Sequence, residues 1–451
     1  MTYIKKYSTS FPAFRITDKV LHPRLGKKGQ HAICYVDEDL ITLAYSAVQD
    51  LGEDVDAILF ATTTPLFKNR YHASFLLELL GLKQGVLALD MGTTSRAGTD
   101  ILLMADKLIR GGEYKNVLLV ASDVYYPGIG KETRSAFGHG SVAMVLSPDT
   151  GIAKLSYAKS FSSGLSEEFN YKGETTKYDT RFAATEGFKK NISLVLNDIE
   201  PSGKDRVIMN SPYNKLATGL LRKAGFDLEQ QLMKDTIGPS VGNTGACHGL
   251  LQIISALESG KGRTILLDYL NGTNAIIVES DTAIDSSSTD AVETEHIEMY
   301  QDYLQLRKQG KFTSKGYESI AMFSSEMIQE RDKEGLLYLK ANKCTNCDTI
   351  YYINAARCNS CHHTEFEKIQ LQRTGTVYSV TSEYYFPASF PPTNMVVIDL
   401  DGGGRVTVQQ TDDMFPNDNN TIGIGDKVML VLRKMMENDT KPNYFWKCKK
   451  L

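Results

Sequence analysis

The fold of this chain is decided by the stretch VLALDMGTTSRAGTDILLMADKLIRGGEYKNVLLVAS, residues 86–122. It opens with an apolar run and continues with a turn of small residues at 92–95. Apolar residues then recur at helical spacing over 97–109, two glycines end the helix, and a second apolar run follows at 117–121. This order predicts a strand, a tight turn, an amphipathic helix and a second buried strand.

Ser95 lies at the predicted start of this helix. Free backbone N–H groups point outward at a helix start, and the helix dipole there favours negative charge. Such a position suits a nucleophile or an oxyanion site. It also suits an ordinary N-cap serine, and residue type and position alone favour the cap.

The totals are those of a globular protein. With 451 residues, 42% of them hydrophobic and 23% charged, the chain is long enough for two or three domains. A net charge of −4 gives no basic footprint for nucleic acid, and no apolar run approaches the ~20 residues that span a bilayer. The N-terminus lacks the apolar core of a signal peptide, and seven cysteines, an odd count, predict reduced thiols in a cytoplasmic protein.

The second half of the chain repeats the first. Strand and helix patterns alternate along residues 1–150, which indicates α/β layers. The stretch VGNTGACHGLLQIISALESGKGRTILLDYLNGTNAIIVES, residues 241–280, then matches the opening stretch at a fixed offset that places Asn243 on Ser95. The match runs without gaps through turn, helix, stop and strand, so it implies a duplicated α/β unit whose two helix tips face each other.

Such a duplication resembles the thiolase superfamily, and within it HMG-CoA synthase and the ketoacyl synthase III enzymes. The segments that carry the resemblance are DAILFATTTP (56–65), YDTRFAATEGFKK (178–190), NSPYNKL (210–216) and VGNTGA (241–246). The resemblance spans residues 1–340. It implies a five-layer α/β/α/β/α domain and a thioester of coenzyme A or of an acyl carrier protein as substrate. It also implies a homodimer or a complex with another thiolase-like subunit, in which the edge strand 117–121 or its neighbours would pair across a twofold axis.

The matching site residues differ from those of the family. The family's cysteine nucleophile, histidine and HMG-CoA synthase glutamate fall on Ser95, Asn210 and Thr63, and the Asn of the GNT loop is retained as Asn243. A serine hydroxyl is a weak nucleophile without an adjacent base. Asn210 cannot accept a proton and Thr63 cannot serve as a general acid or base. The sequence therefore predicts a non-standard site without a cysteine intermediate.

An oxyanion site can still form from the remaining groups. The candidates are the backbone N–H groups of Ser95 and Gly272 and the side-chain amides of Asn210 and Asn243. Tyr213 is a candidate proton donor, and a packed aromatic side chain is the alternative role for it.

Two further groups lie near these segments. Cys247 and His248 follow the Asn loop directly and are a candidate replacement pair, although buried free cysteines are usually inert. His139, in FGHGS, is expected to be a structural loop histidine.

The most specific chemical signal is KCTNCDTIYYINAARCNSCHH, residues 343–363. Two C-x2-C pairs separated by ten residues predict two zinc knuckles that close a tetrahedral, structural zinc site. The predicted ligands are Cys344, Cys347, Cys358 and Cys361. His362 and His363 are possible substitutes, and solvent exposure is the favoured alternative for both.

Short strands alternate with Gly-rich turns after this ribbon, which predicts a small antiparallel barrel of the OB type. A ribbon followed by such a barrel resembles a family that partners thiolase-like enzymes, and this implies binding of acyl-CoA or bridging of thiolase subunits. OB barrels also bind single-stranded nucleic acid through aromatic side chains, here Tyr378, Tyr384, Tyr385 and Phe386. The acidic net charge and the fusion favour coenzyme A.

The sequence predicts four parts along the chain. The parts are a thiolase-like domain at 1–285 with pseudo-repeats at 1–150 and 151–285, a helical connection at 286–340, a zinc ribbon at 341–370 and an OB barrel at 371–451. The predicted function is an HMG-CoA-synthase-like acyltransferase that performs Claisen- or aldol-type C–C chemistry or acyl transfer. The alternative is a catalytically degenerate partner or scaffold subunit of a thiolase-like complex.

Overall fold

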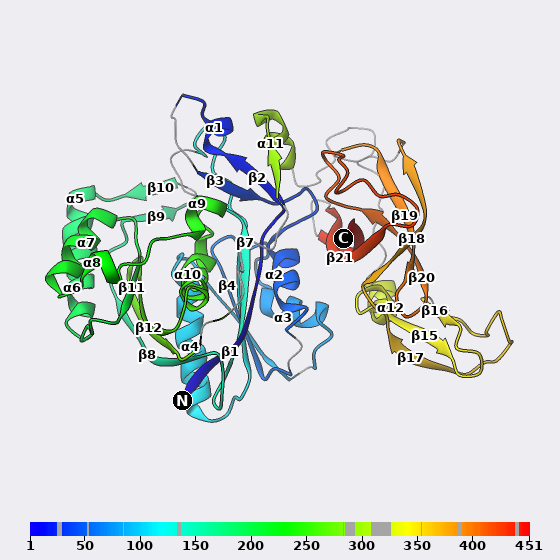
Figure 1. Ribbon diagram of the computed structural model, residues 1–451, viewed down its shortest axis with the longest axis horizontal. Helices are drawn as coiled ribbons and strands as arrows, with labels where there is room; N and C mark the ends of the chain where they lie inside the picture. Colours follow the sequence, from blue (N-terminus) through cyan, green and yellow to red (C-terminus); the bar gives the residue numbers. More distant parts are fainter. Residues whose placement is uncertain are drawn as a thin grey trace. The chain divides into compact units, whose positions relative to one another are not determined.

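The computed structural model of the chain forms two compact units (Figure 1). It describes residues 1–24, 29–51, 54–83, 85–132, 137–172, 174–282, 284, 294–307, 326–352, 354–385, 390–437 and 442–451. Unit 1 comprises Met1–Ile33, Leu43–Glu78 and Leu82–Glu298, and unit 2 comprises Cys34–Thr42, Leu79–Gly81 and Met299–Leu451. The finer division at 285, 340 and 370 stays a prediction.

A nine-stranded sheet organises unit 1. Its strands, in spatial order, are β11 (Arg206–Asn210), β12 (Gly262–Tyr269), β13 (Gly272–Ser280), β8 (Ala153–Ser162), β1 (Thr2–Ser10), β7 (Gly140–Ser147), β6 (Val117–Asp123), β4 (Ala57–Thr62) and β5 (Leu87–Gly92). The duplication is visible in this order. The series β1, β7, β6, β4 corresponds to β8, β13, β12, β11, with the same pairing directions in each half.

The two halves differ at their outer edges. In the first half β5 pairs in parallel along the whole of β4. In the second half the corresponding strand is reduced to one isolated parallel bridge between Val207 and Leu232, beside a 2.9 Å hydrogen bond from the N–H of Met233 to the carbonyl of Val207. The prediction that 117–121 forms an edge strand is therefore wrong. β6 lies inside the sheet between β4 and β7, and β5 is the edge.

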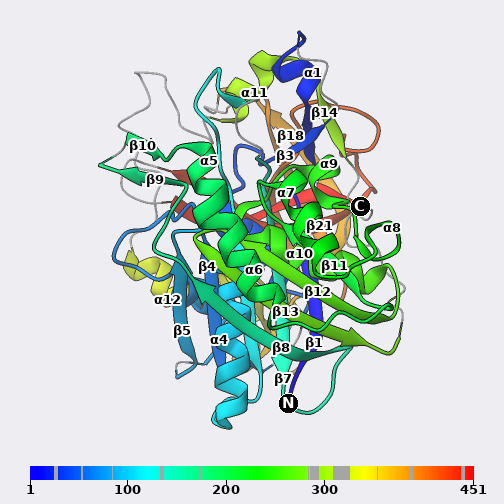
Figure 2. The same ribbon diagram turned by 90° about the vertical axis from the view of Figure 1, so that its left-hand side faces the viewer.

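Helices form the other layers (Figure 1). The middle layer holds α4 (Ala97–Gly111) and α10 (His248–Glu258), which pack between the two halves of the sheet. One outer layer contains α6 (Lys190–Leu196) and α7 (Asn214–Lys223), and the other contains α2 (Leu40–Val48) and α3 (His72–Leu79). Figure 2 shows α6 lying across the strands of the second half. This is the expected duplicated α/β/α/β/α arrangement.

The core follows from the apolar periodicity of the two middle helices. Ile101, Leu102, Leu250, Leu251 and Ile254 are fully buried in one cluster with the central strands. Each such side chain contributes ~1.5–3 kcal/mol of burial free energy. α4 ends at Gly112, whose φ of +85° gives the left-handed C-cap that glycine adopts at no steric cost.

Smaller elements complete unit 1. They are the sheet β14 (Glu295–Ile297), β2 (Phe14–Thr17), β3 (Gln30–Ile33), the hairpin β9 (Glu168–Tyr171) and β10 (Glu174–Lys177), and the helices α1 (Asp18–Leu21), α5 (Thr180–Phe182), α8 (Leu228–Gln231) and α9 (Ile237–Val241). α5 continues through the π-helical segment Ala183–Lys189 into α6.

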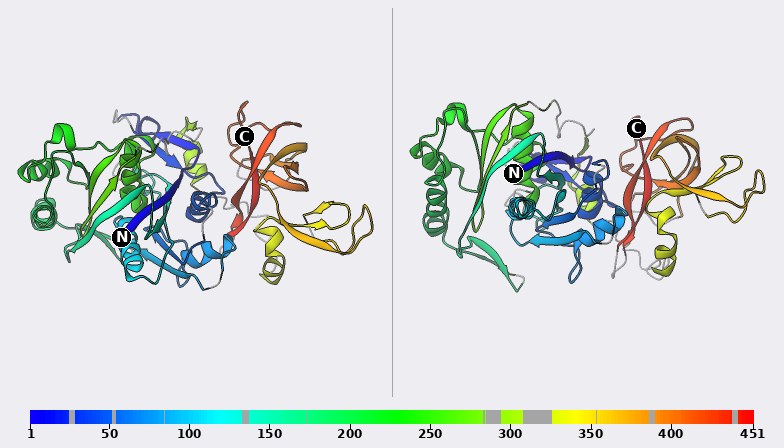
Figure 3. Two further views of the ribbon diagram at one scale, coloured as in Figure 1. Left: turned by 60° about the horizontal axis from the view of Figure 1, so that its bottom comes forward. Right: turned by 90° about the horizontal axis from the view of Figure 1, so that it is seen from below.

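Unit 2 contains a small sheet and a closed barrel, seen as yellow and as orange-to-red strands in Figure 3. The sheet has the order β16 (Ile350–Tyr351), β15 (Lys340–Cys344), β17 (Phe366–Gln370). The barrel has the order β18 (Thr374–Glu383), β19 (Thr393–Leu400), β20 (Arg405–Gln410), β22 (Pro442–Lys450), β21 (Lys427–Glu437). Two helices, α11 (Tyr300–Leu306) and α12 (Glu326–Leu336), precede them. The ribbon and five-stranded barrel are confirmed, and Phe386 lies outside the described residues.

A buried ionic cluster joins the barrel to the segment Cys34–Thr42 of the same unit. Arg433 on β21 lies 3.4 Å from Asp37, 3.0 Å from Glu38 and 3.0 Å from Asp412, and these four side chains are at most 12% exposed. Lys447 on β22 contacts Asp37 at 2.8 Å. Burial raises the pKa of Glu38 to about 7, against the opposing effect of Arg433. The cluster makes Arg433 the shared counter-ion of three carboxylates.

Candidate functional site

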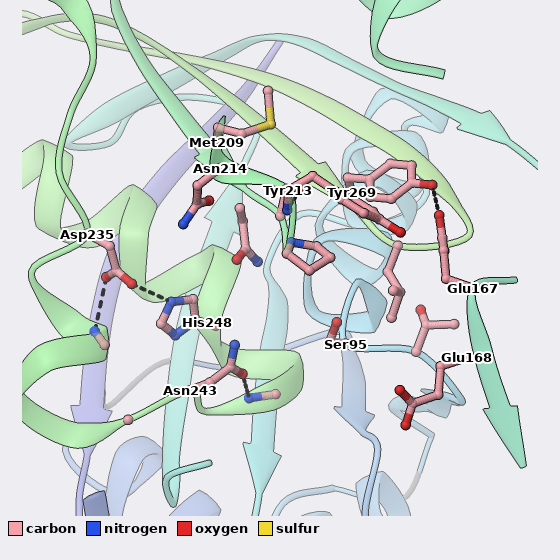
Figure 4. A pocket seen from close by; sticks show the side chains of 18 of the residues that line it. Ser95, Glu167, Glu168, Met209, Tyr213, Asn214, Asp235, Asn243, His248 and Tyr269 are labelled. Atoms are coloured by element: carbon pink, nitrogen blue, oxygen red, sulfur yellow. Dashed lines mark hydrogen bonds and ion pairs between the residues drawn. The ribbon is translucent and has the colours of Figure 1, made fainter. Parts of the chain in front are cut away.

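A cavity of about 1400 Å³ opens in unit 1 where loops of both halves meet. Its lining comes from the β5–α4 loop, the β9–β10 hairpin, the β11–α7 loop, the segment leading into α10 and the β12–β13 turn. Of the predicted site residues, this lining includes Ser95, Asn210, Tyr213 and Asn243. Figure 4 shows Ser95, Asn243, Tyr213 and Tyr269 around it. The structure therefore brings together four predicted residues that are up to 148 positions apart in the chain.

Ser95 is not the N-cap of α4, so that expectation is wrong. The N-cap is Arg96, which makes no side-chain capping bond, and Thr93 before it has a φ of +82°. The turn thus places Ser95 one residue outside the helix, where its side chain faces the cavity. Arg96 instead pairs with Asp100 at 3.3 Å and donates to the carbonyl of Asn271 at 3.4 Å.

The two helix starts approach each other closely, as the duplication predicts. A Cβ atom on Gly98 of α4 would lie 1.9 Å from the carbonyl oxygen of Ala246, just before α10. No larger residue fits there, because real Cβ contacts do not come under 3.0 Å. This contact holds Ser95 and Asn243 on neighbouring walls.

Asn243 is held by its own loop. Its Oδ1 accepts the N–H of Gly245 at 2.9 Å, which is the turn-stabilising contact typical of asparagine. Among the described residues, none accepts a hydrogen bond from Asn243 Nδ2. That amide can therefore donate to a ligand.

Asn210 is fixed from behind by a buried carboxylate. Its Nδ2 donates to Asp268 Oδ1 at 2.9 Å, and Thr99 of α4 donates to Asp268 Oδ2 at 2.6 Å. Burial raises the pKa of Asp268 to about 6. The hydrogen bond occupies one of the two amide hydrogens of Asn210.

Thr63 lies apart from the other predicted residues. Its hydroxyl donates to Asp123 Oδ2 at 2.8 Å, and it lines a second cavity, of about 630 Å³, beside His72. Asp123 also accepts the N–H of Ala246 at 2.7 Å, so it ties the end of β4 to the segment before α10. Burial raises the pKa of Asp123.

Gly272 borders the main cavity without lining it. Its φ is +110°, and a Cβ atom there would lie 2.2 Å from the carbonyl oxygen of Phe161. The lining residues at this turn are Leu270 and Asn271. Its predicted contribution to an oxyanion site stays a prediction.

Tyr213 packs as an aromatic and also faces the cavity. Its ring centroid lies 5.0 Å from that of Phe188 and 6.3 Å from that of Tyr269. Burial, followed by the charge of Glu167, raises the pKa of Tyr213. Tyr213 thus keeps its proton more firmly than an exposed tyrosine.

Cys247 and His139 lie away from the lining. Cys247 is fully buried, its thiol donates to the carbonyl of Gly140 at 3.2 Å, and burial raises its pKa well above the ordinary value. These are the features of an inert thiol. His139 is buried, with its Nε2 3.0 Å from the carbonyl of Tyr125, which fits the structural role expected of it.

Two acid-containing pairs in the lining were not predicted. Tyr269 donates to Glu167 Oε1 on one side of Ser95 in the view of Figure 4, and His248 Nε2 lies 3.0 Å from Asp235 Oδ2 on the other. The sequence drew attention to His248 only through its neighbour Cys247. Glu167 and Asp235 lie in polar stretches with no distinguishing motif.

Several lining side chains have buried polar atoms without a protein partner. Within the described part of the chain these atoms are Glu167 Oε2, His248 Nδ1, Gln252 Oε1 and Asn271 Oδ1. Buried polar atoms in folded proteins normally have a hydrogen-bond partner. Water or a polar ligand in the cavity can supply the missing partners.

The four predicted metal ligands converge in unit 2. All four sulfur atoms lie within 4.8 Å of one another, and the Cys344–Cys361 and Cys347–Cys358 separations are both 3.5 Å. Tetrahedral coordination with Zn–S bonds of about 2.3 Å places the sulfurs ~3.8 Å apart. The cluster therefore has the size of a four-thiolate metal site.

Comparisons with known proteins agree with both parts of the fold. The family model described as "ChsH2, C-terminal OB-fold domain" matches residues 368–433. A DUF35 domain-containing scaffold protein of Methanocaldococcus jannaschii is 34% identical over 100 residues, 21% of this chain and 68% of the relative. Hydroxymethylglutaryl-CoA synthase of Methanosphaera stadtmanae is 22% identical over 343 residues, 70% of this chain and 99% of the relative.

Solved structures show the same fold. An HMG-CoA synthase complexed with CoA has a TM-score of 0.54 at 20% identity, over 68% of this chain and 87% of that one. The curacin-pathway HMG synthase in complex with holo donor-ACP has a TM-score of 0.56 at 15% identity, over 68% and 88%. In the part of the chain that the structure describes, no helix has the length and apolarity needed to cross a membrane.

Proposed function

This chain belongs to the DUF35-domain family and carries in unit 1 the fold of HMG-CoA synthase, and from this we propose that it acts on acyl thioesters. The substrate is an acyl group on coenzyme A or on an acyl carrier protein. The reaction is Claisen- or aldol-type C–C chemistry or acyl transfer, without a covalent acyl-enzyme. Complexes of the structural relatives with CoA and with donor-ACP support this substrate class.

The observation that carries the proposal is the convergence of Ser95, Asn210 and Asn243 on one cavity from both halves of unit 1. Asn243 Nδ2 has no partner among the described residues, and one amide hydrogen of Asn210 remains after its bond to Asp268. Such donors stabilise the negative charge that develops on a thioester carbonyl oxygen. The cavity can thus polarise a bound thioester.

The same geometry supports a reaction without a covalent step. Of the described residues, none that is basic forms a hydrogen bond with the Ser95 hydroxyl, and Asn210 occupies the position of the family's histidine. Thr63, at the position of the glutamate, donates to Asp123 and lines the other cavity. A serine needs an adjacent base to act as a nucleophile.

We also propose that the four-cysteine cluster holds a structural zinc ion. The thiolates fit the size of a tetrahedral sulfur shell, and four protein ligands leave no open position for catalysis. When bound, zinc would hold the two turns around Cys344 and Cys358 together.

The second candidate function is that of a non-catalytic partner subunit. It is favoured by the relationship to a scaffold protein of the DUF35 family. In this role unit 1 would hold a thioester, and the chain would organise a catalytic thiolase-like subunit.

Calorimetric titration with acetyl-CoA and acetoacetyl-CoA tests the proposal. We expect saturable binding that weakens about ten-fold in Asn243→Ala, because a hydrogen bond worth ~1.5 kcal/mol is lost. Asn197→Ala, at the end of α6 and outside the cavity, is the control and should bind like the wild type. No binding of either thioester contradicts the proposal. Binding with turnover only after addition of a second subunit favours the partner role.

A further inference from the structure

The cavity contains a histidine whose ring is oriented by a carboxylate. His248 is the first residue of α10, only 4% of its side chain is exposed, and its ring lines the cavity. Its Nε2 lies 3.0 Å from Oδ2 of Asp235, which lines the same wall (Figure 4).

The carboxylate of Asp235 is itself held rigidly. Its Oδ1 accepts the N–H of Ile237 at 2.9 Å and of Gly238 at 3.0 Å, at the start of α9. A Cβ atom on Gly238 would lie 2.6 Å from Oδ2, so the backbone packs tightly against the carboxylate. The two N–H groups thus bind Oδ1, and Oδ2 is the oxygen that faces His248.

The charge of Asp235 determines which nitrogen of His248 carries the hydrogen. Burial raises the pKa of Asp235, but the hydrogen bond from His248, the histidine charge and the two N–H donors lower it to about 2. The ionised carboxylate accepts only, so Nε2 carries the hydrogen. In neutral His248 the lone pair then lies on Nδ1, which has no partner among the described residues.

Most other titratable groups of the lining have a partner, although Oε2 of Glu167 has none among the described residues. Glu167 accepts from Tyr269, and Glu168 pairs with Lys177 at 2.5 Å. His31, the other lining imidazole among the described residues, has its Nδ1 2.7 Å from the carbonyl of Phe137 and its Nε2 3.1 Å from Asp18. Of the two imidazoles, His248 is the one with a nitrogen left for a ligand.

We propose that His248, oriented by Asp235, is the group that takes a proton from the bound acyl thioester. The inference rests on the proposed function. It assigns to His248 the role of base, which the amide side chain of Asn210 cannot perform. A C–H bond next to the carbonyl breaks and the proton goes to Nδ1. The electron pair of the broken C–H bond forms an enolate, and the Asn243 amide stabilises the negative charge on its oxygen. The negative charge of Asp235 balances the positive charge of the imidazolium. Return of the proton to the carbon restores the thioester.

The first test determines directly which ring nitrogen of His248 carries the hydrogen. Nitrogen-15 NMR of histidine-labelled protein should show His248 protonated on Nε2. In Asp235→Asn the amide oxygen can keep the bonds to Ile237 and Gly238 while its NH2 faces the ring, so the hydrogen should move to Nδ1. His72 is the internal reference, because its Nδ1 lies 2.7 Å from Asp90 and its Nε2 accepts the N–H of Leu66. A hydrogen on Nδ1 of wild-type His248 overturns the inference.

The second test measures proton removal without any further reaction. The probe is the ketone analogue of acetyl-CoA in which a methylene replaces the sulfur, incubated in D2O and followed by mass spectrometry. We expect deuterium to enter the analogue with the wild type and to enter at least 100-fold more slowly with His248→Gln. Asp235→Asn should also slow it. His296→Gln, at an exposed position of β14, should not change the rate.

Binding of the analogue, measured by calorimetry, separates the two proposals. Equal binding with slower exchange in His248→Gln supports the inference. Exchange at the wild-type rate in His248→Gln, or binding to the wild type without exchange, overturns the inference and leaves the proposed function standing. A wild type that binds neither the analogue nor acetyl-CoA overturns the proposed function and the inference together.

Discussion

The side-chain amide of Asn210 donates a 2.9 Å hydrogen bond to Asp268, its register partner on the neighbouring strand β12. Thr99, from the middle helix of the first half, donates to the same carboxylate at 2.6 Å. One buried aspartate thus links both halves of unit 1 and sets the orientation of a cavity residue.

Asp268 should make the stability of unit 1 depend on pH. Its pKa is raised by burial to about 6, whereas an unfolded aspartate titrates near ~3.9. Because the folded state binds this proton more tightly, the stability it contributes is fully present below pH ~4 and is lost as pH rises to ~6, at ~1.4 kcal/mol per unit. Asp268→Asn resembles the protonated form of the side chain, so the stability of this variant should lack this dependence on pH.

Urea unfolding at pH 4.5, 5.5, 6.5 and 7.5 measures the effect. The wild type should lose stability relative to Asp268→Asn as pH rises to 6.5, and the difference should then level off. Asp149→Asn, at an exposed position, is the control and should follow the wild type. Parallel curves for wild type and Asp268→Asn would count against a raised pKa.

Ser95 should not become acylated. We expect no mass shift after incubation with acetyl-CoA or acetoacetyl-CoA, because no described base activates the hydroxyl. Ser95→Cys alone should not restore condensation through an acyl-enzyme, since losing one member of a catalytic unit typically costs a factor of about 10⁴. Ser95→Cys with Asn210→His is the informative pair, and acylation in this double variant alone would indicate a decayed synthase site. An adduct on wild-type Ser95 would show the proposal to be mistaken.

The cysteine cluster should contain one zinc ion per chain by metal analysis of the purified protein. Cys344→Ser should lose the metal and unfold β15, β16 and β17 first, as increased hydrogen exchange there, because metal binding and folding are coupled in such sites. Cys448→Ser removes a buried cysteine outside the cluster and should keep the full zinc content. Metal-free protein with the ribbon still folded would refute the zinc assignment.

Arg433 should be essential to the stability of unit 2. Arg433→Met leaves Asp37, Glu38 and Asp412 without their shared counter-ion, and breaking a buried ion pair in this way costs ~3–5 kcal/mol. Arg405→Met breaks a half-exposed pair with Asp399 and should cost at most ~1 kcal/mol. Thermal unfolding of the two variants compares them, and equal effects would contradict the buried-cluster explanation.

Strand β5 should be the site of self-association or of pairing with a second thiolase-like subunit. It is the outer strand of the sheet. One side of it pairs with β4 along its whole length, and no other described strand pairs with its outer side. Its side chains Leu87, Leu89 and Met91 are half-buried. An unpaired strand edge is a template for another chain. Hydrogen exchange in β5 should slow as protein concentration rises, together with a dimeric mass by sedimentation, whereas β11 should be unaffected. A monomer at micromolar concentration, alone and with a co-expressed subunit, would be evidence against the prediction.

Most of unit 1 could be predicted because its core elements have strong periodicity. The runs that became β4, β6, β7 and β11, and the helices α4 and α10, are apolar enough to be recognised locally. β8 was not predicted, because its apolar/polar alternation breaks after Tyr157 and its position depends on pairing with β1 and β13. The edge strand was misassigned for the same reason, since strand order is a long-range property.

The cavity could be predicted only in part. Ser95 and Asn243 were found because a turn and the internal repeat place them at helix starts, and Asn210 was found through the resemblance of NSPYNKL to an HMG-CoA synthase segment. Glu167 and Asp235 could not be found, because their partners Tyr269 and His248 lie 102 and 13 positions away in the chain. Thr63 was grouped with the site by alignment, but its hydroxyl faces Asp123.

The unequal edges of the nine-stranded sheet limit how copies of this chain can assemble. Growth of a sheet into an open array requires two free ends, one to offer a strand and one to receive it. Among the described strands none pairs with the outer edge of β5, whereas β11 is covered at Val207 by the Leu232 bridge and the Met233 N–H. An association through β5 uses the same end of both molecules, so this contact closes after two subunits.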